Sequence, residues 1–184
     1  MRVVLAAILV AATAFAQAPD RLKGKVAEML KADQDNPPSS EGVIFVGGAN
    51  VEKWDVRHFF GQYRTVNRGM AGARIADTTA FADQLIVPFK PSTIVVWVSP
   101  DESAADFSRF VAKIHAALPK TQLVLVALPP NPQVKAIADQ DKGIKPVDLA
   151  ADDAGYDLMS PMVKLVIQKA EARYWRGYDP IPGQ

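Results

Sequence analysis

Short runs of consecutive apolar residues alternate along the chain with longer segments in which apolar residues recur every three or four positions. Three runs are continuous, at 43–46, 93–98 and 123–126. Such runs are typical of strands that are buried on both faces. The run at 93–98 gives the strongest prediction, because five of its six residues are β-branched. Weaker strands are expected at 65–66 and 145–149.

The segments between these runs have helical spacing. Helices are expected over 18–31, 51–63, 73–87, a stretch around 107–118 and 156–173. In the last of these, residues recur at helical spacing at Leu158, Met162, Leu165, Val166 and Lys169. Strands that alternate with helices predict an α/β fold, a three-layer α/β/α sandwich around a mainly parallel sheet of about five strands.

The amino terminus has the pattern of a secretory signal peptide. Met1 and Arg2 precede an apolar stretch at 3–15 that closes on the small-residue pattern Ala14-Phe15-Ala16. This stretch is shorter than the roughly 20 residues that span a bilayer, although an uncleaved anchor remains an alternative. We expect a signal peptide at 1–16, a leading helix and linker at 17–41, a main domain at 42–173 and an aromatic tail at 174–184. The protein would then be exported, to the periplasm or the medium, with no membrane span after cleavage.

Composition excludes several classes of function. The 21 basic and 20 acidic residues almost cancel, so no basic field exists to attract nucleic acid. The chain has no cysteine and only two histidines, His58 and His115, which removes thiol nucleophiles and thiolate metal sites. We therefore expect no metal and no cofactor.

The predicted sheet places any ligand site beyond the carboxyl ends of its strands. In this chain those ends are residues 47–50, the loop around Gly69, residues 99–102 and whatever follows Leu149. We expect Ala49, Gly69 and Asp101 to line one crevice there, although they are far apart in the sequence.

These segments resemble those of a known family. Residues 45–54 (FVGGANVEKW) resemble the first block of the GDSL-like SGNH hydrolases, and residues 66–72 (VNRGMAG) resemble the second. Residues 86–96 resemble the approach to the third block, and 153–156 the start of the last helix. The match runs in order from about residue 42 to residue 172. It implies a flavodoxin-like SGNH fold and a relationship to enzymes that hydrolyse esters.

The departures from the family pattern fall on its chemistry. The resemblance places the nucleophilic serine at Ala49 and the asparagine of the oxyanion hole at Asp101. Counted back without gaps from the last helix, the catalytic histidine falls on Ala150 and its aspartate on Val147, and no histidine follows His115. Of the four residues that give the family its name, only Gly69 is kept. The vestigial site would comprise Gly47, Gly48, Ala49, Asn50, Gly69, Asp101 and Ala150, with no intact catalytic residue.

Each of these positions also has a purely structural interpretation. Residues 47–50 either cradle an anion with backbone N–H groups or form a tight turn in which Asn50 caps the following helix. Asp101 and Glu102 either hold a cation or a sugar hydroxyl, or simply favour a helix start. Asn67 and Arg68, with Glu102, are the candidate ligand contacts. The tail either docks a partner or carbohydrate or folds back on the domain.

Two functions remain open. In the first, the protein is a catalytically inactive binding or scaffolding module that holds a small molecule, a carbohydrate or a protein in the vestigial acyl-ester cleft. In the second, it is an esterase, acting for example on acylated carbohydrate, with an unorthodox site such as Asp101 or Glu102 with water. The missing histidine favours the first, because a serine or water nucleophile needs a neighbouring base.

Overall fold

Five strands form one parallel sheet at the centre of the molecule. The computed structural model describes residues 20–128, 131–147, 149 and 155–176. The strands are β1 (Val43–Gly47), β2 (Val66–Gly69), β3 (Thr93–Trp97), β4 (Gln122–Val126) and β5 (Ile144–Pro146). They lie in the order β2-β1-β3-β4-β5, and every neighbouring pair is parallel. The fold class predicted from the sequence is confirmed, and this strand order is that of flavodoxin-like sheets.

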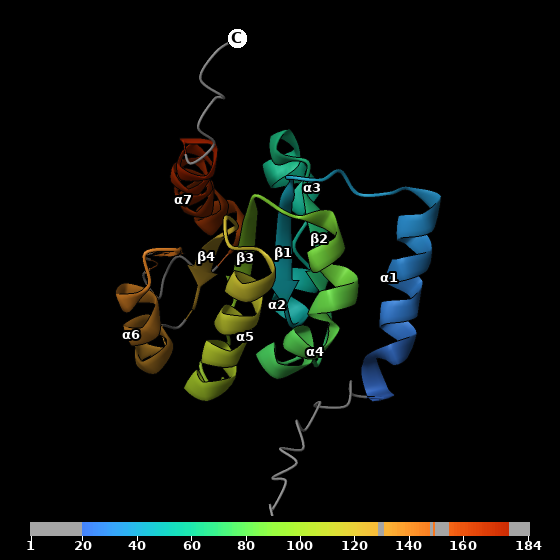
Figure 1. Ribbon diagram of the computed structural model, residues 1–184, viewed down its shortest axis with the longest axis horizontal. Helices are drawn as coiled ribbons and strands as arrows, with labels where there is room; N and C mark the ends of the chain where they lie inside the picture. The colour runs from blue at the N-terminus through green and yellow to red at the C-terminus, as the bar shows by residue number, and fades with distance from the viewer. Residues whose placement is uncertain (1–19, 129–130, 148, 150–154, 177–184) are drawn as a thin grey trace, which may run out of the picture.

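Helices cover both faces of the sheet (Figure 1). One layer contains α1 (Lys23–Asp35), α4 (Ile75–Leu85), α5 (Ala104–Ala117) and α6 (Pro132–Gln140), and the other contains α2 (Ala49–Glu52), α3 (Val56–Phe60) and α7 (Tyr156–Arg176). The remaining described elements are three 3₁₀ turns, η1 (Asp20–Leu22), η2 (Gly61–Tyr63) and η3 (Val87–Phe89). Within the described residues, no helix is both long enough and apolar enough to cross a membrane.

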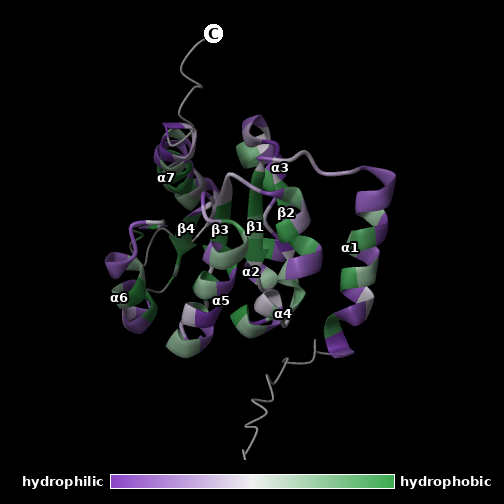
Figure 2. Cartoon of the chain, in the orientation of Figure 1, coloured by the Kyte–Doolittle hydropathy of each residue, from purple (hydrophilic) through white to green (hydrophobic). Residues whose placement is uncertain are grey.

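Alternation of side chains along the strands divides the core into two parts. Ile94 and Val96 of β3 pack with α4 and α5, whereas Val95 and Trp97 pack with α3 and α7. All residues of β1, β3 and β4 are buried. In Figure 2 the apolar strands lie between helices whose residues are mixed in polarity. Burial on both faces explains why the sequence shows continuous apolar runs there.

Several elements differ from the sequence prediction, and one of them is β5, which covers Ile144–Pro146 where a strand over 145–149 is predicted. β2 continues to Gly69 through residues for which the sequence predicts a loop. The helix predicted over 51–63 is divided into α2, α3 and η2. α6 is missing from the prediction because it is short and contains only two large apolar residues, yet Asn131 marks its start by accepting a hydrogen bond from the Val134 N–H at 3.1 Å.

The buried side of α7 is not the stripe expected from the sequence. The helix buries Met159, Val163 and Ile167 against the sheet. Leu158 and Leu165 remain 60% and 59% exposed. Because α7 carries apolar residues on two sides, periodicity alone does not show which side meets the sheet.

Some predictions concern residues outside the described part of the chain. These are the signal peptide at 1–16, Ala150, and the tail from residue 177 onward. The first residues of the predicted tail, 174–176, belong to α7. The cleavage site and the export of the protein therefore stay predictions.

Candidate functional site

The carboxyl ends of three neighbouring strands meet at one edge of the sheet. Gly47 at the end of β1 is in register with Gly69 at the end of β2. On the other side of β1, a Cβ built on Gly47 would lie 3.0 Å from the Cβ of Trp97, the last residue of β3. The loops that follow β1, β2 and β3 therefore begin side by side, as the parallel sheet predicts.

The turn after β1 is closely packed and has no side-chain cap. A Cβ on Gly47 would approach the Val51 side chain to 2.8 Å, so the turn has no room for a larger residue. Gly48 is the N-cap of α2 and no side chain caps this helix, which means that Asn50 is not the predicted cap. Because α2 contains only four residues, its dipole is small, which argues against the anion cradle and favours a simple tight turn. The half-buried methyl group of Ala49 begins the helix.

Asn67 ties the outer edge of β2 to the segment after β1. Its Nδ2 donates to the carbonyl oxygens of Val51 at 2.7 Å and Trp54 at 3.0 Å, and its Oδ1 accepts from the Gly69 N–H at 2.8 Å. These contacts use both ends of the amide and protect an edge strand that would otherwise be open. The Gly69 N–H, which the family resemblance assigns to the oxyanion hole, already has an acceptor.

Gly69 is fixed by the close approach of backbone. A Cβ at this position would lie 2.1 Å from the backbone nitrogen of Glu52 and 2.5 Å from the carbonyl carbon of Val51. Neither atom belongs to a flexible side chain that could move aside. The single name-giving residue that this chain keeps is thus required by packing, independently of any chemistry.

Arg68 lies away from the crevice. Its side chain is 5% exposed and forms an ion pair with Asp33 of α1 at 2.7 Å. Its Nε donates to the Leu85 carbonyl at 3.2 Å, and the guanidinium lies 5.1 Å from the centre of the Phe89 ring. These partners belong to the layer of α1 and α4, because successive strand residues point to opposite faces.

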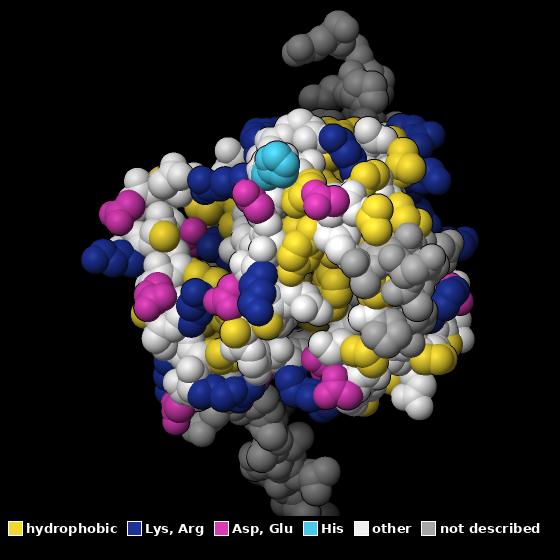
Figure 3. Space-filling view, turned by 180° about the vertical axis from the view of Figure 1, so that it is seen from behind, with side chains coloured by type: hydrophobic (Ala, Val, Ile, Leu, Met, Phe, Trp, Pro, Cys, Tyr) yellow, Lys and Arg dark blue, Asp and Glu magenta, His cyan; other side chains and the backbone are white. Residues whose placement is uncertain are grey.

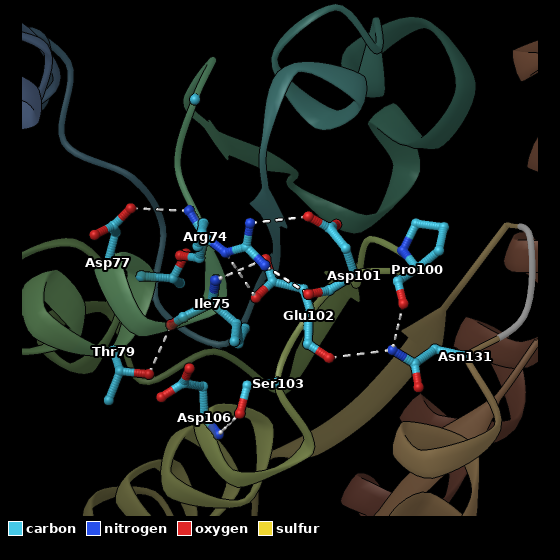
Figure 4. A network of polar contacts seen from close by, with 12 residues as sticks. Arg74, Ile75, Asp77, Thr79, Pro100, Asp101, Glu102, Ser103, Asp106 and Asn131 are labelled. Carbon is cyan, nitrogen blue, oxygen red and sulfur yellow. Dashed lines mark hydrogen bonds and ion pairs between the residues drawn. The ribbon is translucent and has the colours of Figure 1, made fainter.

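Arg74 joins the loop after β3 to the start of α4 (Figure 4). Its Nη1 donates to the Asp101 carboxylate at 2.9 Å, and its Nη2 donates to the Asp101 carbonyl at 2.6 Å. The Arg74 guanidinium holds the pKa of the exposed Asp101 carboxyl below its usual range. Sequence analysis missed Arg74, because nothing in its own segment indicates a partner 27 residues away.

Glu102 caps α4 from outside the helix. Its Oε1 accepts from the backbone N–H of Ile75, the first residue of α4, at 3.1 Å. Its Oε2 is buried without a hydrogen bond and lies 3.6 Å from the Arg74 Nε. Burial raises the pKa of this carboxyl, and the hydrogen bond from Ile75 opposes that effect. Glu102 is therefore a buried structural carboxylate that faces α4.

Asn131 holds the same loop from the opposite side. Its Nδ2 donates to the carbonyl oxygens of Pro100 at 3.0 Å and Glu102 at 3.3 Å, as Figure 4 shows. Since Asn131 also caps α6, the loop is fixed between the starts of two helices. Asp101 is the member of this loop whose carboxylate remains exposed to solvent.

Tyr156 adds an aromatic side chain that the sequence analysis did not place near the site. Its hydroxyl donates to the Asn50 carbonyl at 2.7 Å, and its ring stacks on Trp54 with centres 5.6 Å apart. Burial raises the pKa of the Tyr156 hydroxyl. An aromatic ring thus lies beside the turn that carries Ala49.

The position that corresponds to the family's aspartate lies in the core, and the two histidines of the chain lie away from the site. Val147 is 7% exposed, belongs to the core between the sheet and α7, and donates its N–H to Leu125 at 2.8 Å. His115 lies 3.4 Å from Asp141. Because Asp141 precedes β5, His115 lies at the amino end of that strand. His58 is exposed on α3. Among the described residues no group of three or more potential ligands could hold a metal ion.

Comparison with known proteins gives similarity in structure alone. No protein-family model matches the sequence, and no curated protein matches it. A GDSL-like lipase from Bacteroides thetaiotaomicron superposes with a TM-score of 0.65 at 15% identity, covering 79% of this chain and 98% of the lipase. A Bacteroides fragilis protein assigned as an acylhydrolase gives 0.58 at 17% identity, covering 82% and 96%. A two-domain esterase active on acetylated mannans, crystallised with mannopentaose, gives 0.51 at 15% identity, covering 81% and 53%.

These similarities show that the chain has the fold of the GDSL-like lipases and acylhydrolases. Its five-stranded parallel sheet, flanked by helices on both faces, is SGNH-like. The structural neighbours are ester hydrolases. At identities of 17% or less, the likeness concerns the fold and not the activity.

Proposed function

We propose that this protein is an exported, non-hydrolytic binding module that holds a ligand in the crevice of an ester-hydrolase fold. The observation that carries the proposal is Ala49. It begins the helix after β1, at the position where the family resemblance places the nucleophile, and a methyl group cannot attack a carbonyl.

The surroundings of Ala49 support the same conclusion. Asp101 would place a negative charge where an ester oxyanion develops, so that stabilisation would become repulsion. The Gly69 N–H is engaged by Asn67. The family's histidine base is also lacking, since no histidine follows His115 in the sequence.

The alternative, an esterase that uses Asp101 or Glu102 with water, has one feature in its favour. The buried Glu102 carboxyl has a raised pKa and an oxygen without a hydrogen bond, which are properties of many general acids and bases. The side chain is only 6% exposed, however, and it serves α4 and Arg74. A substrate in the crevice would not reach it, so we favour binding without hydrolysis.

Esterified saccharides are the ligand class that we propose. The segments around the ends of β1 and β3 offer the half-buried ring of Tyr156, the exposed side chain of Asn50 and the ion pair of Arg74 with Asp101. An aromatic ring beside polar groups suits a sugar, which has apolar ring faces and hydroxyl edges. The similar fold of an esterase active on acetylated mannans supports this choice of ligand.

Calorimetric titration with acetylated and deacetylated manno-oligosaccharides tests the proposal. We expect the acetylated ligand to bind more tightly, and Ala49→Phe to weaken its binding by at least tenfold because the new ring fills the crevice. Ala116→Phe is the matched control, since Ala116 is exposed on α5 at the other face of the sheet. Absence of binding, or equal binding by the two phenylalanine variants, would contradict the proposed function.

A further inference from the structure

A groove lies between α1 and the outer edge of β2. Its volume of about 790 Å³ is typical of ligand-binding pockets. The lining comes from the end of α1 and the residues after it, from α3, and from the chain that leads into β2. The groove therefore differs from the proposed crevice, which lies at the carboxyl ends of the strands. Figure 3 shows it toward the left of the molecule, with hydrophobic and basic side chains around it.

Part of the lining is apolar. Trp54 and Val56 contribute buried side chains, and Met29 and Val66 contribute half-buried ones. A ligand with an apolar body would remove this surface from water, which favours its binding.

Three arginines also line the groove. Arg57 and Arg64 are exposed, and their side chains form no hydrogen bond or ion pair with the described residues. Arg68 is buried, where its Nη2 pairs with Asp33 and its Nε donates to the Leu85 carbonyl. Its Nη1 donates to no acceptor in the described part of the chain. The groove thus offers guanidinium donors that the fold itself does not use.

The acidic residues of the lining do not balance these arginines. They are Asp33, which pairs with Arg68, and Asp55, which caps α3 by accepting from the His58 N–H at 3.1 Å. Three arginines against two aspartates leave the lining with a net charge of +1. One carboxylate balances that charge, whereas a phosphate dianion exceeds it. The planar guanidinium also matches the two oxygens of a carboxylate.

Arg64 has a backbone conformation that disfavours a side chain. Its φ of 52° and ψ of 60° lie in the left-handed region, where a Cβ is crowded and glycine is preferred. The turn itself is closely packed, since a Cβ on Gly42 would lie 2.4 Å from the Arg64 carbonyl oxygen. Glycine at position 64 would therefore keep the turn and remove only the guanidinium from the groove.

We propose that this groove binds an aliphatic monocarboxylate, such as a fatty acid of medium chain length. Its carboxylate lies among the guanidinium groups of Arg57 and Arg64, and its chain lies against Met29 and Val66. A neutral lipid or sugar would leave the excess positive charge without a partner. This site goes beyond the proposed function and does not depend on it, because neither the crevice nor an ester takes part.

Calorimetric titration with octanoate tests the site, with 1-octanol as the neutral probe of the same chain length. We expect octanoate to bind the parent protein about tenfold or more tighter than octanol, because hydrogen bonds to a charged group are strong. Affinity should rise by about threefold per methylene from butyrate to octanoate. Absence of octanoate binding, or equal binding of octanol, would overturn the proposal. Inorganic phosphate or a glutamate hexapeptide that binds as tightly as octanoate would also overturn it.

Arg64→Gly separates binding from folding. We expect this variant to bind octanoate about tenfold more weakly and to keep its stability in urea denaturation, because glycine adopts a positive φ readily. Lys90→Gly is the matched control, since Lys90 is also basic and exposed, has a φ of 45° and lies outside the groove. It should bind octanoate as the parent does. Undiminished binding by Arg64→Gly, or an equal loss in both variants, would contradict the assignment.

Discussion

Two parts of the crevice edge differ in what their residues do for the fold. At the end of β2, Asn67 and Gly69 are bound into the structure by hydrogen bonds and by backbone contact. After the end of β1 the side chain of Ala49 is half-buried, and after the end of β3 the side chain of Asp101 is exposed. The residues of the first part match the family pattern that the sequence resembles, and those of the second part do not. The comparison teaches that the matching positions are the ones that hydrogen bonds and backbone packing require in this fold.

The largest effect is expected at Gly69. Gly69→Ala would place a Cβ 2.1 Å from the Glu52 nitrogen, and the backbone of α2 would have to move. We expect the free energy of unfolding to fall by about 3 kcal/mol or more, the upper range for overpacking. Urea denaturation measures this change.

Gly61→Ala is the matched control for this substitution. Gly61 has a φ of −53°, and a Cβ added there meets nothing within 4 Å. This variant should be unchanged or more stable by about 0.5 kcal/mol, because alanine reduces the entropy of the unfolded chain. Equal effects of the two alanines would contradict the packing role assigned to Gly69.

Loss of the Asn67 amide should have the next largest effect. Asn67→Ala removes two donated hydrogen bonds and one accepted bond, and leaves the Val51 carbonyl, the Trp54 carbonyl and the Gly69 N–H without these partners. We expect a loss of about 2 to 3 kcal/mol in urea denaturation. Asn50→Ala, at an exposed position that does not cap α2, should change stability by less than about 0.5 kcal/mol. A loss of about 1 kcal/mol there would instead indicate a cap.

The two neighbouring carboxylates after β3 should respond to pH in opposite directions. Burial raises the folded-state pKa of Glu102 above its ordinary value of 4.5, so its neutral form favours the folded state. That contribution is complete below pH 4.5 and is lost as the pH rises through the folded-state pKa. The stability of the parent protein relative to Glu102→Gln should therefore decrease from pH 4.5 upward, as measured by urea denaturation at each pH.

Asp101→Asn supplies the opposite case. The Arg74 ion pair lowers the pKa of Asp101, so its contribution is present above the ordinary pKa and disappears as the pH falls. Because Asp101 is exposed, we expect a smaller change than at Glu102. If the stability of the parent relative to each variant changes with pH in the same direction for both variants, burial does not dominate the pKa of Glu102.

Much of the fold follows from the sequence, because continuous apolar runs and helical spacing reflect burial directly. The extension of β2 to Gly69 escapes prediction because its polar residues are stabilised by partners distant in the sequence, such as Asp33 for Arg68. α6 could have been found, since Asn131 followed by Pro132 is a typical helix start. The role of Arg74 could not, because it depends on how the loop after β3 meets α4.

The positions of the candidate site were predictable to different degrees. The parallel-sheet rule brings the ends of β1, β2 and β3 together without knowledge of any side chain. It does not show that Arg68 points away from the crevice or that Glu102 faces α4. Those orientations follow from strand alternation and from a helix start that needs an acceptor, and both depend on three-dimensional neighbours.

Hydrolysis of p-nitrophenyl acetate by the purified protein tests the central claim most directly. We predict that the parent protein and Ala49→Ser both release nitrophenol at the buffer rate at neutral pH, because a serine hydroxyl at this position would still lack a base. Adding Asp101→Asn, Ala150→His and Val147→Asp would complete the family's set, but the aspartate would enter the buried position of Val147 and destabilise the fold. Turnover by the parent protein that rises in proportion to its concentration and disappears in Glu102→Gln would contradict the claim and identify an esterase with an unorthodox site.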